Sequence, residues 1–214
     1  MKHCFFLFSL ILSLMTVLLS TSTTQGADEP STLIIPVRIH LVHADHDAAL
    51  TTTLTELDIH RIMGKVNTIW AQAHIRFTIE SLGKTEALKS SKESDPGTFG
   101  SVIELMPKNR LLEKGINIFY VKELTPNGFY SQGLVFVKDT ARLAEVPGGL
   151  DEPIPRVTAH EIGHALSLQH RQEVTNLMAS GKSGFLLNEA EITATRAVAI
   201  SKFGTSATKA EQNK

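Results

Sequence analysis

Residues 160–170 read HEIGHALSLQH, and this stretch decides how the chain must fold. His160 and His164 are four positions apart, so on an α-helix their side chains leave the same face about one turn from each other. Two imidazoles placed in this way can bind one metal ion. Glu161 follows the first histidine, where a carboxylate can take a proton without being a metal ligand itself. The spacing therefore predicts a metal-binding helix.

His170 can complete the site only if the helix is short. A continuous helix would carry His170 about 15 Å along the axis from His160, which no single ion spans. If His170 is a ligand, the helix must end soon after His164, and the chain must turn back sharply near Ser167. The sequence thus makes a three-histidine site conditional on a reversal at one position.

A second motif follows the histidines. The tripeptide Asn176-Leu177-Met178 stands after His170 at a short spacing. Together with the histidine run it resembles the metzincin clan of zinc peptidases, whose signature is HExxHxxGxxH followed by a methionine-containing turn. The spacing from the third histidine to the methionine is similar to that of the matrixins. The resemblance extends over residues 33–203, where the order of predicted elements is also that of the clan.

The resemblance implies roles for individual residues. It makes His160, His164 and His170 the ligands of one catalytic Zn²⁺, Glu161 the general base, and Met178 the structural methionine beneath the metal. Residues 179–186 would border the pocket for the side chain that follows the cleaved bond.

Two positions depart from the clan pattern. Ser167 stands where the clan has glycine, at a position that needs a left-handed backbone, and a non-glycine residue there costs about 1–2 kcal/mol. Metal ligation can contribute far more to stability than this. Ser180 stands two residues after Met178 and is not the tyrosine that some metzincins use, so no tyrosine role is assigned.

The predicted ligand set indicates a reaction. Three neutral imidazoles leave zinc dipositive with an open fourth position, where the pKa of a bound water falls towards about 7. Glu161 would take the proton of this water as it attacks a peptide carbonyl, and would pass it to the leaving amine. The sequence therefore predicts a zinc metalloendopeptidase that acts on protein or peptide substrates. One alternative is a catalytically weak or inactive zinc-binding domain that serves as a binding module. Another is a zinc peptidase whose third ligand is Glu189 or Glu191.

The beginning of the chain has the pattern of an export signal. Lys2 supplies a positive start, residues 5–19 are almost entirely apolar, and small residues follow. The apolar run is shorter than the roughly 20 residues of a spanning helix, so we expect cleavage and no stable membrane anchor afterwards. We expect a signal peptide at residues 1–26, a single catalytic domain at 27–204 and a disordered tail at 205–214, in a secreted or periplasmic, cell-envelope protein.

Composition argues against a nucleic-acid partner and against chemistry that needs a cysteine. Lys+Arg 21 against Asp+Glu 22 leaves no basic stripe for a phosphate backbone, so nucleic acid is not an expected partner. The single cysteine, Cys4, lies in the predicted signal, so the mature chain has neither a disulfide nor a thiol nucleophile. The oligomeric state does not follow from the sequence.

Hydrophobic periodicity predicts an α+β fold. The resemblance to the metzincin clan implies a zincin- or metzincin-like single domain with a twisted mixed sheet, a long backing helix, a zinc-binding active-site helix and a C-terminal helix. Pro126-Asn127-Gly128 predicts a turn, and residues 83–100 and 141–155 predict loops. The predicted strands are 33–42, 74–82, 115–121 and 133–137; the predicted helices are 54–70 with Leu57 on its apolar face, one that begins near Arg156, and 189–202 capped by Asn188.

A second set of histidines lies near two acidic residues. His40, His43 and His46 are three residues apart, close to Asp45 and Asp47. In a strand His40 and His43 project to opposite faces, so surface histidines are the favoured interpretation, with a second metal site as the alternative.

Overall fold

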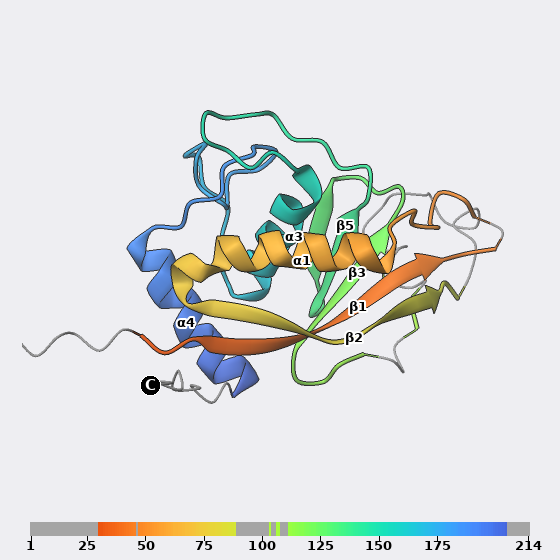
Figure 1. The fold of residues 1–214 in the computed structure, drawn as a ribbon, viewed down its shortest axis with the longest axis horizontal. Coiled ribbons are helices and arrows are strands. Elements are labelled where there is room, and N and C mark those ends of the chain that lie inside the picture. The colour runs from red at the N-terminus through yellow and green to blue at the C-terminus, as the bar shows by residue number, and fades with distance from the viewer. Residues whose placement is uncertain (1–29, 46, 89–102, 104–105, 108–110, 205–214) are drawn as a thin grey trace, which may run out of the picture.

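The computed structural model describes residues 30–45, 47–88, 103, 106–107 and 111–204 (Figure 1). The predicted signal peptide, most of the predicted loop 83–100 and the predicted tail lie outside the described residues. The described chain forms a mixed α/β fold with a five-stranded mixed sheet and three α-helices. Its elements are β1 (Leu33–His43), α1 (Glu56–Trp70), the 3₁₀ helix η1 (Ala71–Ala73), β2 (Ile75–Glu86), β3 (Ile116–Val121), β4 (Gly128–Ser131), β5 (Leu134–Lys138), α3 (Pro153–Ala165) and α4 (Glu189–Phe203).

The strand order is β2-β1-β3-β5-β4. The first four strands pair in parallel, and β4 runs antiparallel to β5 at the edge of the sheet. The four predicted strands are confirmed within a few residues. The prediction missed β4, because its turn signal at Pro126-Asn127-Gly128 leads directly into a strand of only four residues.

Helix α1 begins at a capping box. Thr55 accepts a hydrogen bond from the Asp58 amide at 3.2 Å, and the Asp58 carboxylate accepts one from the Thr55 amide at 2.9 Å. The buried stripe of the helix contains Ile59, but Leu57 is 80% exposed, so its predicted place on the apolar face was wrong. The reason is geometric: Leu57 comes two residues before Ile59, so its side chain points about 200° away from Ile59 around the helix axis.

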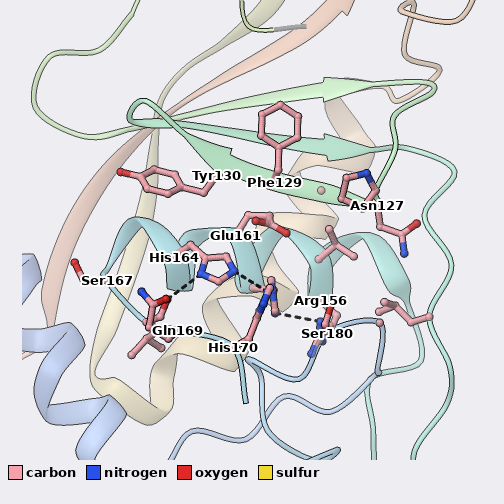
Figure 2. Close-up of a pocket in the computed structure, with 17 residues that line it drawn as sticks. Asn127, Phe129, Tyr130, Arg156, Glu161, His164, Ser167, Gln169, His170 and Ser180 are labelled. Atoms are coloured by element: carbon pink, nitrogen blue, oxygen red, sulfur yellow. Dashed lines mark hydrogen bonds between the residues drawn. The ribbon is translucent and has the colours of Figure 1, made fainter. Parts of the chain in front are cut away.

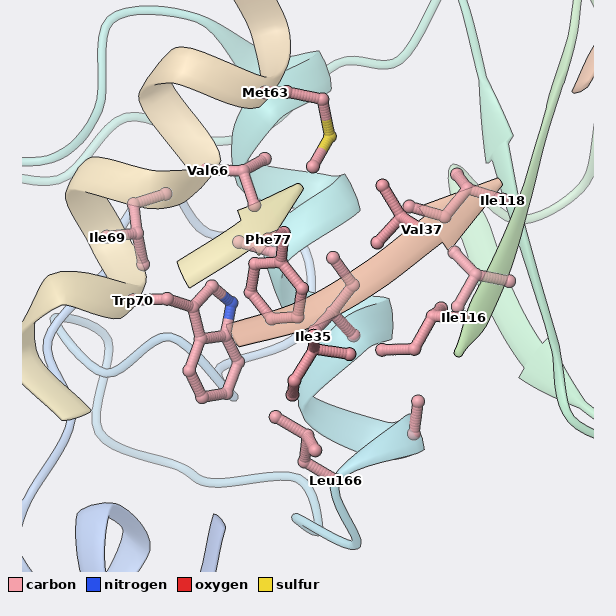
Figure 3. Packing of buried hydrophobic residues seen from close by; sticks show 14 of the residues in the cluster. Ile35, Val37, Met63, Val66, Ile69, Trp70, Phe77, Ile116, Ile118 and Leu166 are labelled. Atoms are coloured by element: carbon pink, nitrogen blue, oxygen red, sulfur yellow. The ribbon is translucent and has the colours of Figure 1, made fainter. Parts of the chain in front are cut away.

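The main core lies between the sheet and helices α1 and α3. Figure 3 shows Ile35 and Val37 of β1 facing Val66 and Trp70 of α1 in this core. Trp70 is fully buried. These contacts hold α1 and α3 on one face of the sheet, where α3 also packs against β5 and β4.

A smaller core covers the opposite face of the sheet. It gathers Val42, Phe119 and Phe136 with residues from loops. His40 projects into this layer, where it is 3% exposed, stacks on Phe119 at 4.1 Å between ring centroids, and has its Nδ1 2.8 Å from Thr85 Oγ1. The predicted surface position of His40 was therefore wrong, because both faces of this sheet are covered.

Hydrogen bonds from helix α4 connect the C-terminal part of the chain to the start of the sheet. The predicted cap Asn188 is confirmed, since its side chain accepts from the Glu191 amide at 3.0 Å. Arg196 donates to the carbonyls of Ala73 at 2.9 Å and Ser31 at 3.0 Å. None of the helices in the described residues combines the length and the apolar character that a membrane crossing requires.

Candidate metal centre

Helix α3 ends where the three-histidine hypothesis requires. It begins at Pro153, three residues before the predicted start, with proline in its first turn. Its last residue is Ala165, and Ser167 follows with a φ of 71°. The Leu168 amide donates to the Gly163 carbonyl and the Ser167 amide to the His164 carbonyl, both at 2.9 Å, which is the Schellman arrangement of a helix end. The predicted reversal near Ser167 is confirmed.

This reversal brings the three predicted histidines together (Figure 2). The ring centroids of His160 and His164 are 4.8 Å apart, those of His164 and His170 4.8 Å, and those of His160 and His170 5.2 Å. One ring nitrogen from each histidine lies within 4.8 Å of the others, so the group could hold a metal ion. It draws two members from α3 and one from the chain beyond the turn.

Backbone carbonyls fix the tautomers of two of these histidines. His160 Nδ1 lies 2.8 Å from the Leu177 carbonyl oxygen, and His164 Nδ1 lies 2.8 Å from the Leu168 carbonyl oxygen. A carbonyl can only accept, so both Nδ1 atoms carry the proton and both Nε2 atoms keep a lone pair. This is the second contact that metal-binding histidines usually make.

The spacing of two of the ligand nitrogens fits a tetrahedral zinc ion. With Zn–N bonds of about 2.0–2.1 Å, two ligands of a tetrahedral site lie about 3.3–3.4 Å apart. His164 Nε2 and His170 Nε2 are 3.2 Å apart. The ligand type, the tautomers and this spacing all suit a divalent cation of the zinc kind.

The protein environment keeps the first two histidines neutral. Burial lowers the pKa of His160 to about 3, although the Leu177 carbonyl acts in the opposite direction. Burial also lowers the pKa of His164. Both side chains are therefore neutral imidazoles at physiological pH, and only the neutral form can offer a lone pair to a metal.

Glu161 lies on the cleft wall under the edge strand β4. It is 5% exposed, and burial raises the pKa of its carboxyl to about 8, against the opposing effect of the Arg156 charge. A Cβ atom on Gly128 would lie 3.0 Å from Glu161 Cγ and 2.7 Å from Val157 Cγ1. Only a glycine at this position lets β4 approach α3 so closely. The sequence marked Gly128 as a turn residue and gave no sign of this contact.

A cleft of about 600 Å³ contains the histidines and Glu161. Figure 2 shows Phe129 and Tyr130 of β4 on one side of it, and His170 and Ser180 on the other. Sequence reasoning missed β4 as a wall of this cleft, because the position of an edge strand depends on contacts distant in the sequence.

Met178 packs beneath the histidine-bearing helix. Its side chain is fully buried, and a Cβ atom on Gly163 would lie 2.6 Å from its sulfur atom. The Met178 amide donates to Asn176 Oδ1 at 2.6 Å, and the Met178 carbonyl accepts from the Arg171 amide at 2.9 Å. The methionine turn is thus tied to the chain that follows His170.

Glu191 stabilises this turn from α4. The carboxylate is 2% exposed and accepts hydrogen bonds from Arg171 Nε at 2.9 Å, Asn176 Nδ2 at 2.8 Å and the Asn188 amide at 3.0 Å. Neither Glu191 nor Glu189 belongs to a group of potential ligands in the described part of the chain. Their alternative role as third metal ligand is not supported. The capping-box pattern Asn188-x-x-Glu191 could have indicated the bond of Glu191 to the Asn188 amide, but no sequence motif indicated its bonds to Arg171 and Asn176.

The second histidine set is only partly assembled. His43 Nε2 lies 3.1 Å from Asp45 Oδ1, and Glu86 joins them within 4.8 Å. His40 is buried elsewhere, and His46 lies outside the described residues. The three grouped side chains lie at the surface, where acidic groups often gather without an ion.

Comparison with known proteins shows a likeness in structure alone. No protein-family model and no curated protein matches the chain. Among solved structures, mirolysin in complex with compound 9 is 14% identical, with a TM-score of 0.54 over 78% of this chain and 91% of that chain. A chaperone–substrate complex is 11% identical, with a TM-score of 0.48 over 80% of this chain and 35% of that chain. The likeness to the mirolysin structure shows that the two chains share the arrangement of their helices and strands.

Proposed function

We propose that this chain is a secreted zinc-dependent endopeptidase of the metzincin kind. The observation that carries the proposal is the meeting of His160, His164 and His170 in an open cleft beside the buried carboxyl of Glu161. The likeness of the fold to that of mirolysin, a metallopeptidase, supports it independently of the histidine motif.

The three imidazoles would hold the metal through Nε2, since two of the Nδ1 atoms already donate to carbonyls. When bound, zinc supplies a positive charge that polarises the peptide carbonyl and favours deprotonation of both the attacking water and the Glu161 carboxyl. Met178 and the turn that contains it would support the ligands from below, as a structural element with no part in proton transfer.

Glu161 would move the proton. Its carboxylate would take a proton from the attacking water and deliver it to the nitrogen of the leaving amine. Burial against β4 restricts the carboxyl to few rotamers and excludes bulk water from its inner side. Burial raises the pKa of this carboxyl to about 8, and the positive charge of the metal would act in the opposite direction, so the carboxylate that accepts the proton would form when the metal is bound.

The substrate would be an extended segment of a protein or peptide. In the described residues β4 pairs only with β5, so its outer edge is open above the cleft. An extended peptide can bind such an edge through main-chain hydrogen bonds, with alternate side chains pointing into the cleft. An open groove with a free strand edge is the arrangement that favours a protease over a closed zinc-binding domain.

The organisation of the chain remains part of the proposal. We infer from the sequence that residues 1–26 are a signal peptide and that residues 27–204 form the catalytic domain, followed by a tail at 205–214. The mature protein, without its signal peptide, would then be secreted or released to the cell envelope.

The test compares metal content and proteolysis in variants of the secreted chain. Wild type should contain one zinc per chain and cleave unfolded protein. Glu161→Gln should keep zinc and lose at least about 100-fold in activity, because it cannot take up a proton. His170→Ala should lose both zinc and activity. Glu189→Gln, an exposed control on α4, should match wild type.

The outcome also decides between the two functional classes. A wild type that binds zinc but cleaves no unfolded protein would support the binding-module alternative. Undiminished cleavage by Glu161→Gln would refute the proposed mechanism, whatever the zinc content.

A further inference from the structure

Arg156 is a buried arginine in the first turn of α3, one helical turn before His160. Its side chain is 1% exposed. It forms no ion pair in the part of the chain that the structure describes. A guanidinium in such a place needs compensating hydrogen bonds, because removing an uncompensated charge from water is strongly unfavourable. The groups that accept hydrogen bonds from Arg156 therefore indicate its role.

These partners are backbone carbonyls of one segment, residues 176–184. Arg156 Nη2 donates to the carbonyls of Ala179 at 2.6 Å and Leu177 at 2.7 Å, and Nε donates to that of Gly184 at 3.0 Å. Carbonyl oxygens that converge on one point repel each other unless a cation lies between them. The shape of the 176–184 segment, which contains Met178 and lines the cleft, therefore depends on this guanidinium.

One of these carbonyls also orients a predicted metal ligand. The Leu177 oxygen accepts from both Arg156 Nη2 at 2.7 Å and His160 Nδ1 at 2.8 Å. Arg156 Nη1 lies 3.4 Å from His160 Nδ1, but both atoms carry protons, so this is a packing contact. The guanidinium thus acts on His160 through the position of the Leu177 carbonyl.

We propose that Arg156 is a positioning residue of the metal centre, which holds the Leu177 carbonyl where it fixes the Nδ1–H tautomer of His160 and directs Nε2 towards the ion. This inference rests on the proposed metal site but not on the proposed peptidase activity. Partners of this kind set both the ring orientation and the protonated nitrogen of metal-binding histidines.

The first test uses ¹⁵N NMR of the histidine rings in the metal-free full chain, for wild type, Arg156→Met and the control Arg38→Met. Arg38 pairs with Glu80 near the surface, so its loss removes an arginine without touching the centre. Wild type and Arg38→Met should show His160 protonated at Nδ1, and Arg156→Met a mixture of tautomers. A wild-type His160 protonated at Nε2 would overturn the proposal without recourse to any variant.

Zinc affinity, measured by competition with a chelating dye, is a second test. A positioning role of Arg156 and a purely electrostatic role predict changes of opposite sign in this affinity. Loss of positioning should weaken zinc binding by Arg156→Met about tenfold. Loss of a nearby positive charge alone would tighten it, because two cations repel each other. Tighter or unchanged binding by Arg156→Met would therefore contradict the positioning role.

A lysine variant covers the case in which Arg156→Met does not fold. Arg156→Lys keeps the charge but replaces the planar fork by a single point of donors, so it cannot hold three carbonyls in the same way. It should show mixed His160 tautomers and weaker zinc binding, and wild-type behaviour in both would overturn the proposal. If wild type binds zinc with these properties but cleaves no peptide, the peptidase proposal fails and the role of Arg156 stands.

Discussion

Replacing Ser167 by glycine should make the protein more stable. Ser167 has a φ of 71° at the helix end that returns His170 to the site. A left-handed backbone costs a non-glycine residue about 1–2 kcal/mol. Glycine removes that strain but loses about 0.5–1 kcal/mol more conformational entropy on folding. The difference is a net gain of roughly 0.5–1 kcal/mol in the free energy of unfolding.

No described contact opposes this gain. The Ser167 side chain is exposed, and the hydrogen bond from its amide to the His164 carbonyl uses the backbone alone, so glycine keeps it. For a domain of this size the gain corresponds to a rise of about 1–4 °C in the melting temperature. Urea unfolding of the metal-free protein, followed by circular dichroism, measures the free energy directly.

Ser201→Gly is the matched control. Ser201 is exposed in α4, where glycine should lower the free energy of unfolding by about 0.5 kcal/mol through its poor helix propensity. The two serine-to-glycine changes therefore have opposite predicted signs. If Ser167→Gly were as stable as wild type or less stable, while Ser201→Gly behaved as expected, the argument from backbone strain would be wrong.

Three further predictions follow from contacts of the site. Gly128→Ala should destabilise the protein by about 1–3 kcal/mol in urea unfolding, because its Cβ overlaps Val157, whereas Gly64→Ala in the open interior of α1 should stabilise it by about 0.5–1 kcal/mol. Glu161 has a raised pKa when folded, so the stability it contributes is present below about pH 4.5 and lost as pH rises through about 8. Metal-free wild type should therefore lose about 4–5 kcal/mol relative to Glu161→Gln over that window, and parallel pH profiles would contradict this. Glu191→Ala should lower the free energy of unfolding by about 2–4 kcal/mol, because buried donors lose their acceptor, and a change below about 0.5 kcal/mol would exclude that role.

The sequence predicted the features that depend on local spacing. The cap at Asn188, the end of α3 and the reversal at Ser167 each follow from a few neighbouring residues, and the structure has all of them. The meeting of His160 and His170 is of the same kind, because the turn that joins them is short.

Features that depend on distant segments were not predictable in this way. Leu57 is a different case, because its place outside the buried stripe of α1 follows from the helical period itself. His40 is buried because loops cover the second face of the sheet. Arg156 and Gly128 show no motif, since their roles depend on the 176–184 segment and on β4 crossing α3.

The three histidines lie within eleven consecutive residues, and this compactness would affect how the protein acquires the proposed metal. Closing so short a loop has a small entropic penalty, so a partly folded chain can already chelate an ion through His160 and His164 on a nascent helical turn. Chelation by the unfolded chain reduces the net stabilisation that the metal gives to the folded state. Zinc would therefore accelerate folding, as a nucleation template for α3, and would stabilise the folded state by less than if the unfolded chain bound no metal.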